Sequence, residues 1–150
     1  MPGAWTQNFY HAVFSTKRRA PWISAEVEGR LYAFLTGIAR DLDCEVLALN
    51  GMPDHVHFVV RYPGDLSHAD LVRHLKGRSS KWIHETIPEL REFAWQEGYG
   101  GFTVSRSALD QVVEYVKRQK EHHRRMTFEQ EFMAMLEKHG MKPTEDDALG

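Results

Sequence analysis

The chain has 150 residues, a formal net charge of −2, and a composition that is 42% hydrophobic and 27% charged, which is typical of one soluble globular domain. The charge argues against a protein that coats nucleic acid nonspecifically, although it leaves room for a local basic surface. A single cysteine, Cys44, excludes an internal disulfide framework and a multi-cysteine metal site. No apolar stretch approaches the ~20 residues that cross a bilayer. We therefore expect no membrane association, and the lack of a signal pattern at the N-terminus predicts a cytoplasmic location.

The first half of the chain predicts a strand, a helix and a β-hairpin. Residues 8–15 (NFYHAVFS) are rich in aromatic and β-branched residues and predict a strand. Ser24 is a good N-cap, and the apolar residues behind it recur at helical spacing: Val27, Leu31, Phe34, Leu35, Ile38 and Leu42. Residues 45–50 (EVLALN) and 55–61 (HVHFVVR) then predict two strands joined by a short turn.

The second half predicts three helices and one further strand. A helix begins near Ser67 and continues until Pro88 approaches, and residues 102–104 form a strand after a glycine-rich bend. Ser105 or Ser107 caps the next helix, whose apolar positions are Leu109, Val112, Val113 and Val116. Thr127 and Gln130 form a capping-box pattern ahead of a last helix that ends near Gly140.

This order of elements predicts an α+β fold of the split βαβ kind, which is ferredoxin-like or RRM-like. We expect about four antiparallel strands with helices on one face, with the hairpin central and the other face available for a ligand. The helix after residue 105 and the C-terminal helix are additions to this core. The pattern predicts one domain over residues 1–140 and a flexible polar tail over residues 141–150.

Two histidines in the predicted strand 55–61 indicate half of a metal site. Side chains alternate along a strand, so His55 and His57 point to one face while Val56 and Phe58 point into the core. The spacing lacks the further His or Asp of an HxHxD or HxHxH hydrolase site. The chain also contains no HExxH motif and no glycine-rich phosphate loop of the GxxxxGK type.

A second pair, Tyr115 and Gln119, is separated by four residues and shares one face of a predicted helix. If that helix packs beside the hairpin, Gln119 offers its amide oxygen to a cation held by His55 and His57, and Tyr115 stands about one turn away. Such a set suits phosphodiester transesterification, with the tyrosine hydroxyl as nucleophile. The ligands favour Mg²⁺ or Mn²⁺, although imidazoles also accept zinc.

A basic segment within the predicted helix 67–87 indicates nucleic acid as a partner. Basic side chains neutralise phosphates, hydroxyl groups hydrogen-bond to them, and an indole stacks on an unpaired base. The candidate DNA-binding residues are Arg73, Lys76, Arg78, Ser79, Lys81 and Trp82. A solvated helix face with the tryptophan in the core explains the same pattern equally well.

Five segments together resemble the single-tyrosine HUH transposases of small insertion sequences, a family that includes repeat-associated tyrosine transposases. The segments appear in the family's order and span roughly residues 8 to 120: YHAVFSTK (10–17), MPDHVH (52–57), LKGRSS (75–80), WQEGY (95–99) and YVKRQ (115–119). The PDHVH block followed by a later YxxxQ is the more specific part of this pattern.

The resemblance implies that His55, His57 and Gln119 ligate the metal and that Tyr115 is the nucleophile. It implies single-stranded DNA substrates marked by hairpins, which are cleaved and rejoined through 5′-phosphotyrosine intermediates. It also implies a homodimer, in which the tyrosine helix often completes the partner's active site. His11 lies in one of the family segments and is a possible site residue without an assigned role.

Two other classes of function stay open at this point. One is a non-catalytic RNA- or DNA-binding module, because an RRM-like sheet can display aromatic side chains that stack on bases. The aromatic-rich strand motif of that class is absent here, and the candidates on the exposed face are histidines. The other is a metal-dependent phosphodiesterase that uses water, which would leave Tyr115 idle.

Overall fold

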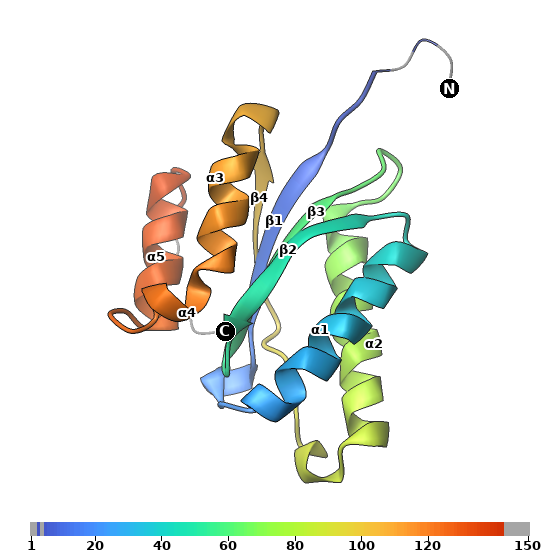
Figure 1. Ribbon diagram of the computed structural model, residues 1–150, viewed down its shortest axis with the longest axis vertical. Coiled ribbons are helices and arrows are strands. Elements are labelled where there is room, and N and C mark those ends of the chain that lie inside the picture. Colours follow the sequence, from blue (N-terminus) through green and yellow to red (C-terminus); the bar gives the residue numbers. More distant parts are fainter. Residues whose placement is uncertain (1–2, 4, 143–150) are drawn as a thin grey trace.

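The computed structural model describes residue 3 and residues 5–142, and these form one sheet with helices on both of its faces (Figure 1). Residues 143–150 of the predicted tail lie outside the described residues. The elements in chain order are β1 (Phe9–Ser15), η1 (Lys17–Arg19), α1 (Ala25–Asp41), β2 (Glu45–Met52), β3 (His55–Arg61), α2 (His68–Thr86), η2 (Pro88–Leu90), β4 (Gly100–Val104), α3 (Arg106–Lys117), α4 (Gln119–His122) and α5 (Phe128–Lys138).

The four strands are antiparallel and lie in the order β2-β3-β1-β4. This confirms the predicted α+β sheet of the split βαβ kind. We expected the hairpin of β2 and β3 to be central, but only β3 is, because the N-terminal strand β1 pairs with both β3 and β4. Strand β3 is therefore an inner strand, and β2 forms the edge. The inner position gives β3 hydrogen-bonded neighbours on both sides, which holds its side chains in a fixed register.

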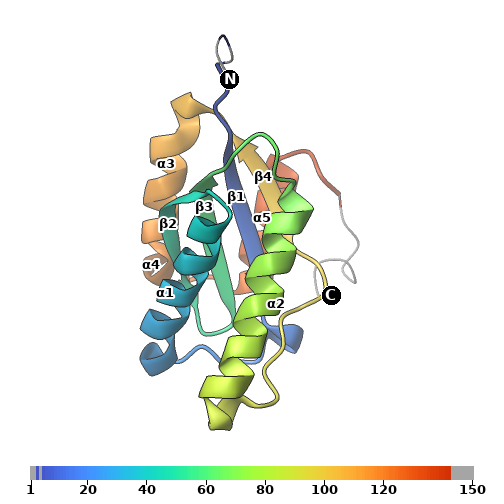
Figure 2. The same cartoon turned by 90° about the vertical axis from the view of Figure 1, so that its right-hand side faces the viewer.

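Helices α1 and α2 cover one face of the sheet, as Figure 2 shows. Val56, Phe58 and Val60 of β3 pack with the apolar sides of both helices in the largest hydrophobic cluster. Ser24 caps α1 and Ser67 caps α2 through side-chain hydrogen bonds, so both predicted helix starts are confirmed.

The other face is covered by α3, α4 and α5 instead of standing open for a ligand. Val13 and Phe102 of the sheet pack against α5, and Phe9, Ala48 and Val59 pack against α3. The apolar positions that we predicted in these two helices need a sheet surface to bury them. His55 and His57, the two histidines of the predicted metal site, therefore lie beneath a layer of helices.

Two boundaries differ from the predicted ones in a way that affects the site. Strand β2 extends to Met52, which brings the end of the hairpin beside His55. Helix α3 ends at Lys117, and Arg118 separates it from the short helix α4 that begins at Gln119. Tyr115 and Gln119 thus lie on successive helices rather than on one.

The C-terminal helix α5 begins with the predicted capping box. The Thr127 side chain accepts from the Gln130 backbone, and the Gln130 side chain accepts from the Thr127 backbone.

None of the helices in the described part of the chain has both the length and the apolar character that a bilayer crossing requires.

Candidate metal centre and nucleophile

The two histidines of β3 point to the same face of the sheet, as the alternation of strand side chains predicts. His55 and His57 are both 0% exposed, and their ring centroids lie 5.2 Å apart. The alternate residues Val56 and Phe58 point into the opposite core. Because β3 is an inner strand, the sheet fixes the spacing of the two imidazoles.

Gln119 reaches this pair from the start of α4. Its Oε1 lies 3.2 Å from Nε2 of His55, and the side chain is fully buried. Tyr115, half-buried on the last turn of α3, places its ring 5.9 Å from that of His57. The structure therefore brings together the four residues that the sequence singled out, and it does so within one chain.

His11 joins the cluster from the neighbouring strand β1. Its Nε2 lies 2.8 Å from Nδ1 of His57, and the residue is buried. The contact is made by Nδ1 of His57, which leaves the other ring nitrogen, Nε2, for a different partner. His11, to which the sequence assigned no role, thus holds one ring nitrogen of His57 in a buried contact.

Two further residues, Glu131 and His123, enter the cluster and were not predicted from the sequence. Glu131 of α5 places Oε1 at 2.8 Å from Nε2 of His57 and 2.9 Å from Nε2 of His123. Its Oε2 accepts a hydrogen bond from the Tyr115 hydroxyl and another, of 2.9 Å, from the Gln119 amide. A signal for Glu131 does exist in the sequence, because it occupies a buried position between Phe128 and Phe132 on an amphipathic helix. His123 carries no comparable signal.

The charges in the cluster are set by burial and by these contacts. Burial favours the protonated form of Glu131, but hydrogen bonds from His123, His55 and His57 outweigh it and hold its pKa well below the usual range. Burial lowers the pKa of His57 to about 4 despite its contact with Glu131. Burial also opposes charge on His55, yet hydrogen bonds to Asp54 and Glu131 raise its pKa to about 9. Burial and the contact with Glu131 raise the pKa of Tyr115.

The predicted DNA-binding residues all lie on α2, across the sheet from this cluster (Figure 2). Arg73, Arg78 and Lys81 are exposed, although Arg78 pairs with Asp41 and Arg73 pairs with Asp70. These three cationic side chains can contact a DNA phosphate backbone at the surface of α2, but they lie far from the histidine cluster, on the other face of the sheet. Their role in DNA binding stays a prediction.

The other three predicted DNA-binding residues make contacts within the protein. Ser79 is fully buried, donates to the Leu75 carbonyl at 2.5 Å and accepts from Trp95 at 2.9 Å. It is therefore a core residue with no free hydroxyl for a phosphate. Lys76 donates to the carbonyls of Gln96 and Gly98. Trp82 stacks on Phe34, with ring centroids 4.8 Å apart, so it packs between α1 and α2.

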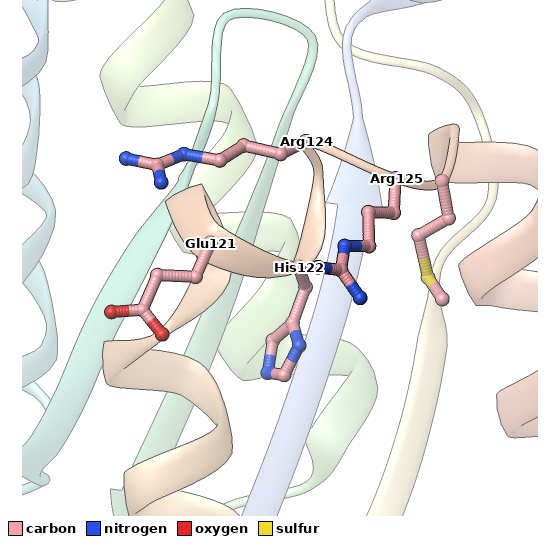
Figure 3. A pocket seen from close by; sticks show the side chains of 5 residues that line it. Glu121, His122, Arg124 and Arg125 are labelled. Atoms are coloured by element: carbon pink, nitrogen blue, oxygen red, sulfur yellow. The ribbon is translucent and has the colours of Figure 1, made fainter.

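A surface pocket lies along α4 and the connection to α5 (Figure 3). It is lined by Glu121, His122, Arg124, Arg125 and Met126. The His122 ring stacks on Tyr115 with centroids 4.5 Å apart, so one wall of the pocket contacts the tyrosine. Figure 3 shows the Arg124 and Arg125 side chains extending in different directions, which puts positive charge on two sides of it.

A tyrosine hydroxyl beside a buried histidine pair, on a split βαβ sheet, places the protein in the class of single-tyrosine HUH enzymes. The comparison with protein families agrees, because the model of the family "Transposase IS200 like" matches residues 4–119. The chain belongs to this family of transposases, which are DNA-cleaving enzymes.

Individual relatives support the assignment. The chain is 30% identical over 115 residues to the ISDra2 transposase TnpA of Deinococcus radiodurans, which covers 73% of this chain and 82% of that protein. It is 28% identical over 118 residues to the transposase for insertion sequence element IS200 of Salmonella typhimurium, covering 75% of this chain and 76% of the relative.

Solved structures show the same fold. A crystal structure of a putative transposase from Deinococcus radiodurans superimposes with a TM-score of 0.67 at 29% identity, over 79% of this chain and 95% of that one. A REP-associated tyrosine transposase bound to a REP hairpin gives a TM-score of 0.62 at 16% identity, over 82% of this chain and 73% of that one. The second likeness concerns the fold alone.

Proposed function

We propose that this transposase cleaves and rejoins single-stranded DNA ends through a 5′-phosphotyrosine intermediate on Tyr115. The observation that carries the proposal is the position of the Tyr115 hydroxyl. It contacts Glu131, whose other oxygen contacts His57, so the nucleophile and the histidine pair share one buried cluster.

The reaction is an exchange of phosphodiester bonds. The Tyr115 oxygen forms a bond to the phosphorus, the bond from phosphorus to the 3′ oxygen breaks, and a free 3′ hydroxyl leaves. The reverse attack by a 3′ hydroxyl restores a DNA strand and frees the tyrosine. Because one phosphodiester replaces another, no nucleotide cofactor is needed.

The chain's own residues control the tyrosine proton. Burial and Glu131 raise the pKa of Tyr115, so the phenol is protonated at neutral pH. The hydroxyl donates its hydrogen bond to Oε2 of Glu131, which holds the tyrosine in place and puts an acceptor at its proton. A neutral phenol is a poor nucleophile, and such an acceptor is what its activation requires.

The family resemblance implies a divalent metal, Mg²⁺ or Mn²⁺, held by His55, His57 and Gln119. The donor set fits, because two Nε2 atoms and one amide oxygen converge on one buried point. When bound there, the ion offsets negative charge on the phosphoryl group.

We further propose hairpin-marked single-stranded DNA as the substrate, as the family resemblance implies. The hairpin bound by the REP-associated transposase of the same fold supports this choice. The homodimer stays a prediction as well. Tyr115 lies beside its own chain's His57, which supports a nucleophile that acts within one chain.

The non-catalytic binding module is the weaker alternative. A module of the RRM kind uses an open sheet face with exposed aromatics, whereas here α3 and α5 cover that face. Binding to DNA without formation of an adduct would nevertheless support it.

The experiment is a search for a covalent protein–DNA adduct. The protein is incubated with Mn²⁺ and a pool of single-stranded hairpin DNAs and run on a denaturing gel. We expect an adduct that disappears with chelator and in the Tyr115→Phe variant. Tyr99→Phe is the matched control, because Tyr99 is exposed and lies outside the cluster. An adduct that persists in Tyr115→Phe would contradict the assignment of the nucleophile.

A further inference from the structure

His123 and Glu131 lie outside the ligand set that the family resemblance implies, yet they enter the same cluster. Together with His55 and His57 they form a group whose ligand atoms all lie within 4.8 Å of one another. The side chains are almost completely enclosed, with Glu131 1% exposed and the His123 side chain 4% exposed. Two residues from the C-terminal part of the chain thus face the histidines of β3.

The partners of the Nδ1 atoms of His55 and His123 determine whether the Nε2 atoms, which face Glu131, carry a proton. Nδ1 of His55 contacts the Asp54 carboxylate at 2.7 Å, and Nδ1 of His123 contacts the Met126 carbonyl at 2.9 Å. Both partners only accept hydrogen bonds, so each Nδ1 carries the proton. In a neutral imidazole, Nε2 is then an unprotonated acceptor.

If both imidazoles are neutral, these two acceptors face a third. Nε2 of His55 lies 3.4 Å from Oε1 of Glu131, and Nε2 of His123 lies 2.9 Å from the same oxygen. Oε1 of Gln119 lies 3.2 Å from Nε2 of His55. Lone pairs facing one another in a buried site are unfavourable, unless the imidazoles are charged or a cation sits among them.

The spacing of the donor atoms suits a cation. Oε1 of Glu131 lies 2.8 Å from Nε2 of His57, 2.9 Å from Nε2 of His123 and 3.4 Å from Nε2 of His55. Ligand atoms held at about 2.1 Å from a common ion are about 3.0 Å apart in an octahedron and about 3.4 Å apart in a tetrahedron. Hydrogen bonds from the outer nitrogens to a carboxylate and a carbonyl are also the usual support for metal-binding histidines.

We propose that Glu131 and His123 are metal ligands of this transposase, in addition to His55, His57 and Gln119. The proposal rests on the proposed function, since it concerns the same centre. A third imidazole makes the set richer in nitrogen than His₂Gln, which favours Mn²⁺, Co²⁺ or Zn²⁺ over Mg²⁺. The bound carboxylate keeps its second oxygen on Tyr115, which ties the metal centre to the nucleophile.

The C-terminal helix is anchored well enough to supply a ligand. Phe128 and Phe132 pack against Val13 and Phe102 of the sheet, on either side of Glu131 in the sequence. Arg19 of η1 forms an ion pair with Glu129 on the same turn. The helix therefore presents the carboxylate from a fixed position, as a metal ligand requires.

The rival explanation is that the Glu131 carboxylate takes the place of the metal and blocks the site. The two explanations predict opposite changes in metal affinity when the charge of Glu131 is removed. A ligand that is lost weakens binding, whereas a competitor that is lost strengthens it.

The test is calorimetric titration of the metal-stripped full chain with Mn²⁺, comparing wild type with Glu131→Gln and His123→Ala. We expect each variant to bind Mn²⁺ at least about tenfold more weakly than wild type. The controls are Glu137→Gln, an exposed residue of α5, and His74→Ala on α2 across the sheet. Circular dichroism of each variant establishes that it is folded, and His123→Ala tests the proposal by itself if Glu131→Gln does not fold.

The outcomes separate this proposal from the proposed function. Unchanged or tighter Mn²⁺ binding in both variants would overturn the proposal, while loss of binding in His57→Ala would leave the proposed centre standing. Failure of the wild-type protein to bind any divalent ion would instead count against the proposed function.

Discussion

Nε2 of His11 on β1 lies 2.8 Å from Nδ1 of His57 on β3, across two neighbouring strands. Burial and the nearby His57 lower the pKa of His11 to about 3, so His11 is neutral at pH 7. The contact fixes the ring of His57 with its Nε2 turned toward Glu131. We therefore propose that His11 positions His57 in the proposed metal centre.

His11→Ala should therefore weaken Mn²⁺ binding by about ten- to a hundredfold, the usual effect of removing a residue that orients a metal-binding histidine. The measurement is the Mn²⁺ titration described above, accompanied by thermal unfolding to separate loss of orientation from loss of fold. His11→Gln, which can still hydrogen-bond to His57, should recover part of the affinity. Equal affinity in His11→Ala and wild type would show that His57 needs no such support.

The metal-free protein should be most stable near pH 6.5. His57 and His11 have folded pKa values of about 4 and 3, below the ordinary 6.5, so the unfolded chain binds more protons and stability falls as pH drops below 6.5. His55 has a raised folded pKa of about 9. The folded chain binds the extra proton there, so stability falls as pH rises from 6.5 through 9.

Thermal unfolding in chelator between pH 4 and pH 9 checks this expectation. Added Mn²⁺ should remove much of the loss on the alkaline side, because the ion replaces the proton among the histidines. A metal-free protein whose stability rises steadily to pH 9 would contradict the charges assigned to His55.

Gly51 at the end of the hairpin should not tolerate a side chain. A Cβ there would lie 2.1 Å from the backbone oxygen of His55 and 2.9 Å from Cα of Val56. Gly51→Ala should therefore lower the free energy of unfolding by about 1–3 kcal/mol and weaken Mn²⁺ binding, because His55 must shift.

Gly37→Ala is the matched control for that substitution. Gly37 lies in α1, and a Cβ there meets nothing within 4 Å, so the change should stabilise the helix by about 0.5–1 kcal/mol. Urea unfolding of both variants gives the comparison. Equal stability of the two would mean that the hairpin has more room than the structure gives it.

Ser79 and Lys81 should separate stability from DNA binding. Ser79→Ala leaves the Trp95 indole N–H without its buried partner, which should lower the free energy of unfolding by about 1–3 kcal/mol. Lys81 is exposed, so Lys81→Ala should leave stability unchanged and weaken binding to single-stranded DNA, with a smaller dependence on salt.

Urea unfolding and salt-dependent DNA titrations measure the two effects. The folded Ser79→Ala variant should keep its DNA affinity. A loss of affinity whose salt dependence equals that of wild type would show that the hydroxyl does contact the substrate. No effect of Lys81→Ala at any salt concentration would remove α2 from the DNA-binding surface.

The sequence predicted the parts of the site that depend on local periodicity. The alternation in 55–61 was enough to place His55 and His57 on one face. Tyr115 and Gln119 were singled out by their spacing together with the resemblance of residues 115–119 to the transposase family. The continuous helix expected for the second pair was wrong, since Arg118 interrupts it. The break allows both side chains to reach Glu131.

The contributions of His11, His123 and Glu131 depend on packing between distant segments, which spacing does not encode. His11 meets His57 only because β1 pairs with β3. Glu131 enters the centre only because α5 packs over the sheet face that we expected to be open. A glutamate among the apolar residues of an amphipathic helix was the available sign of a buried role.

Peptide mapping of the covalent adduct by mass spectrometry tests the central claim most directly. Wild-type protein is incubated with Mn²⁺ and hairpin-marked single-stranded DNA, the DNA is trimmed with nuclease, and the modified peptide is sequenced. We predict a nucleotide joined through its 5′ phosphate to Tyr115. A modification on any other residue, or cleaved DNA with no modified peptide, would contradict it.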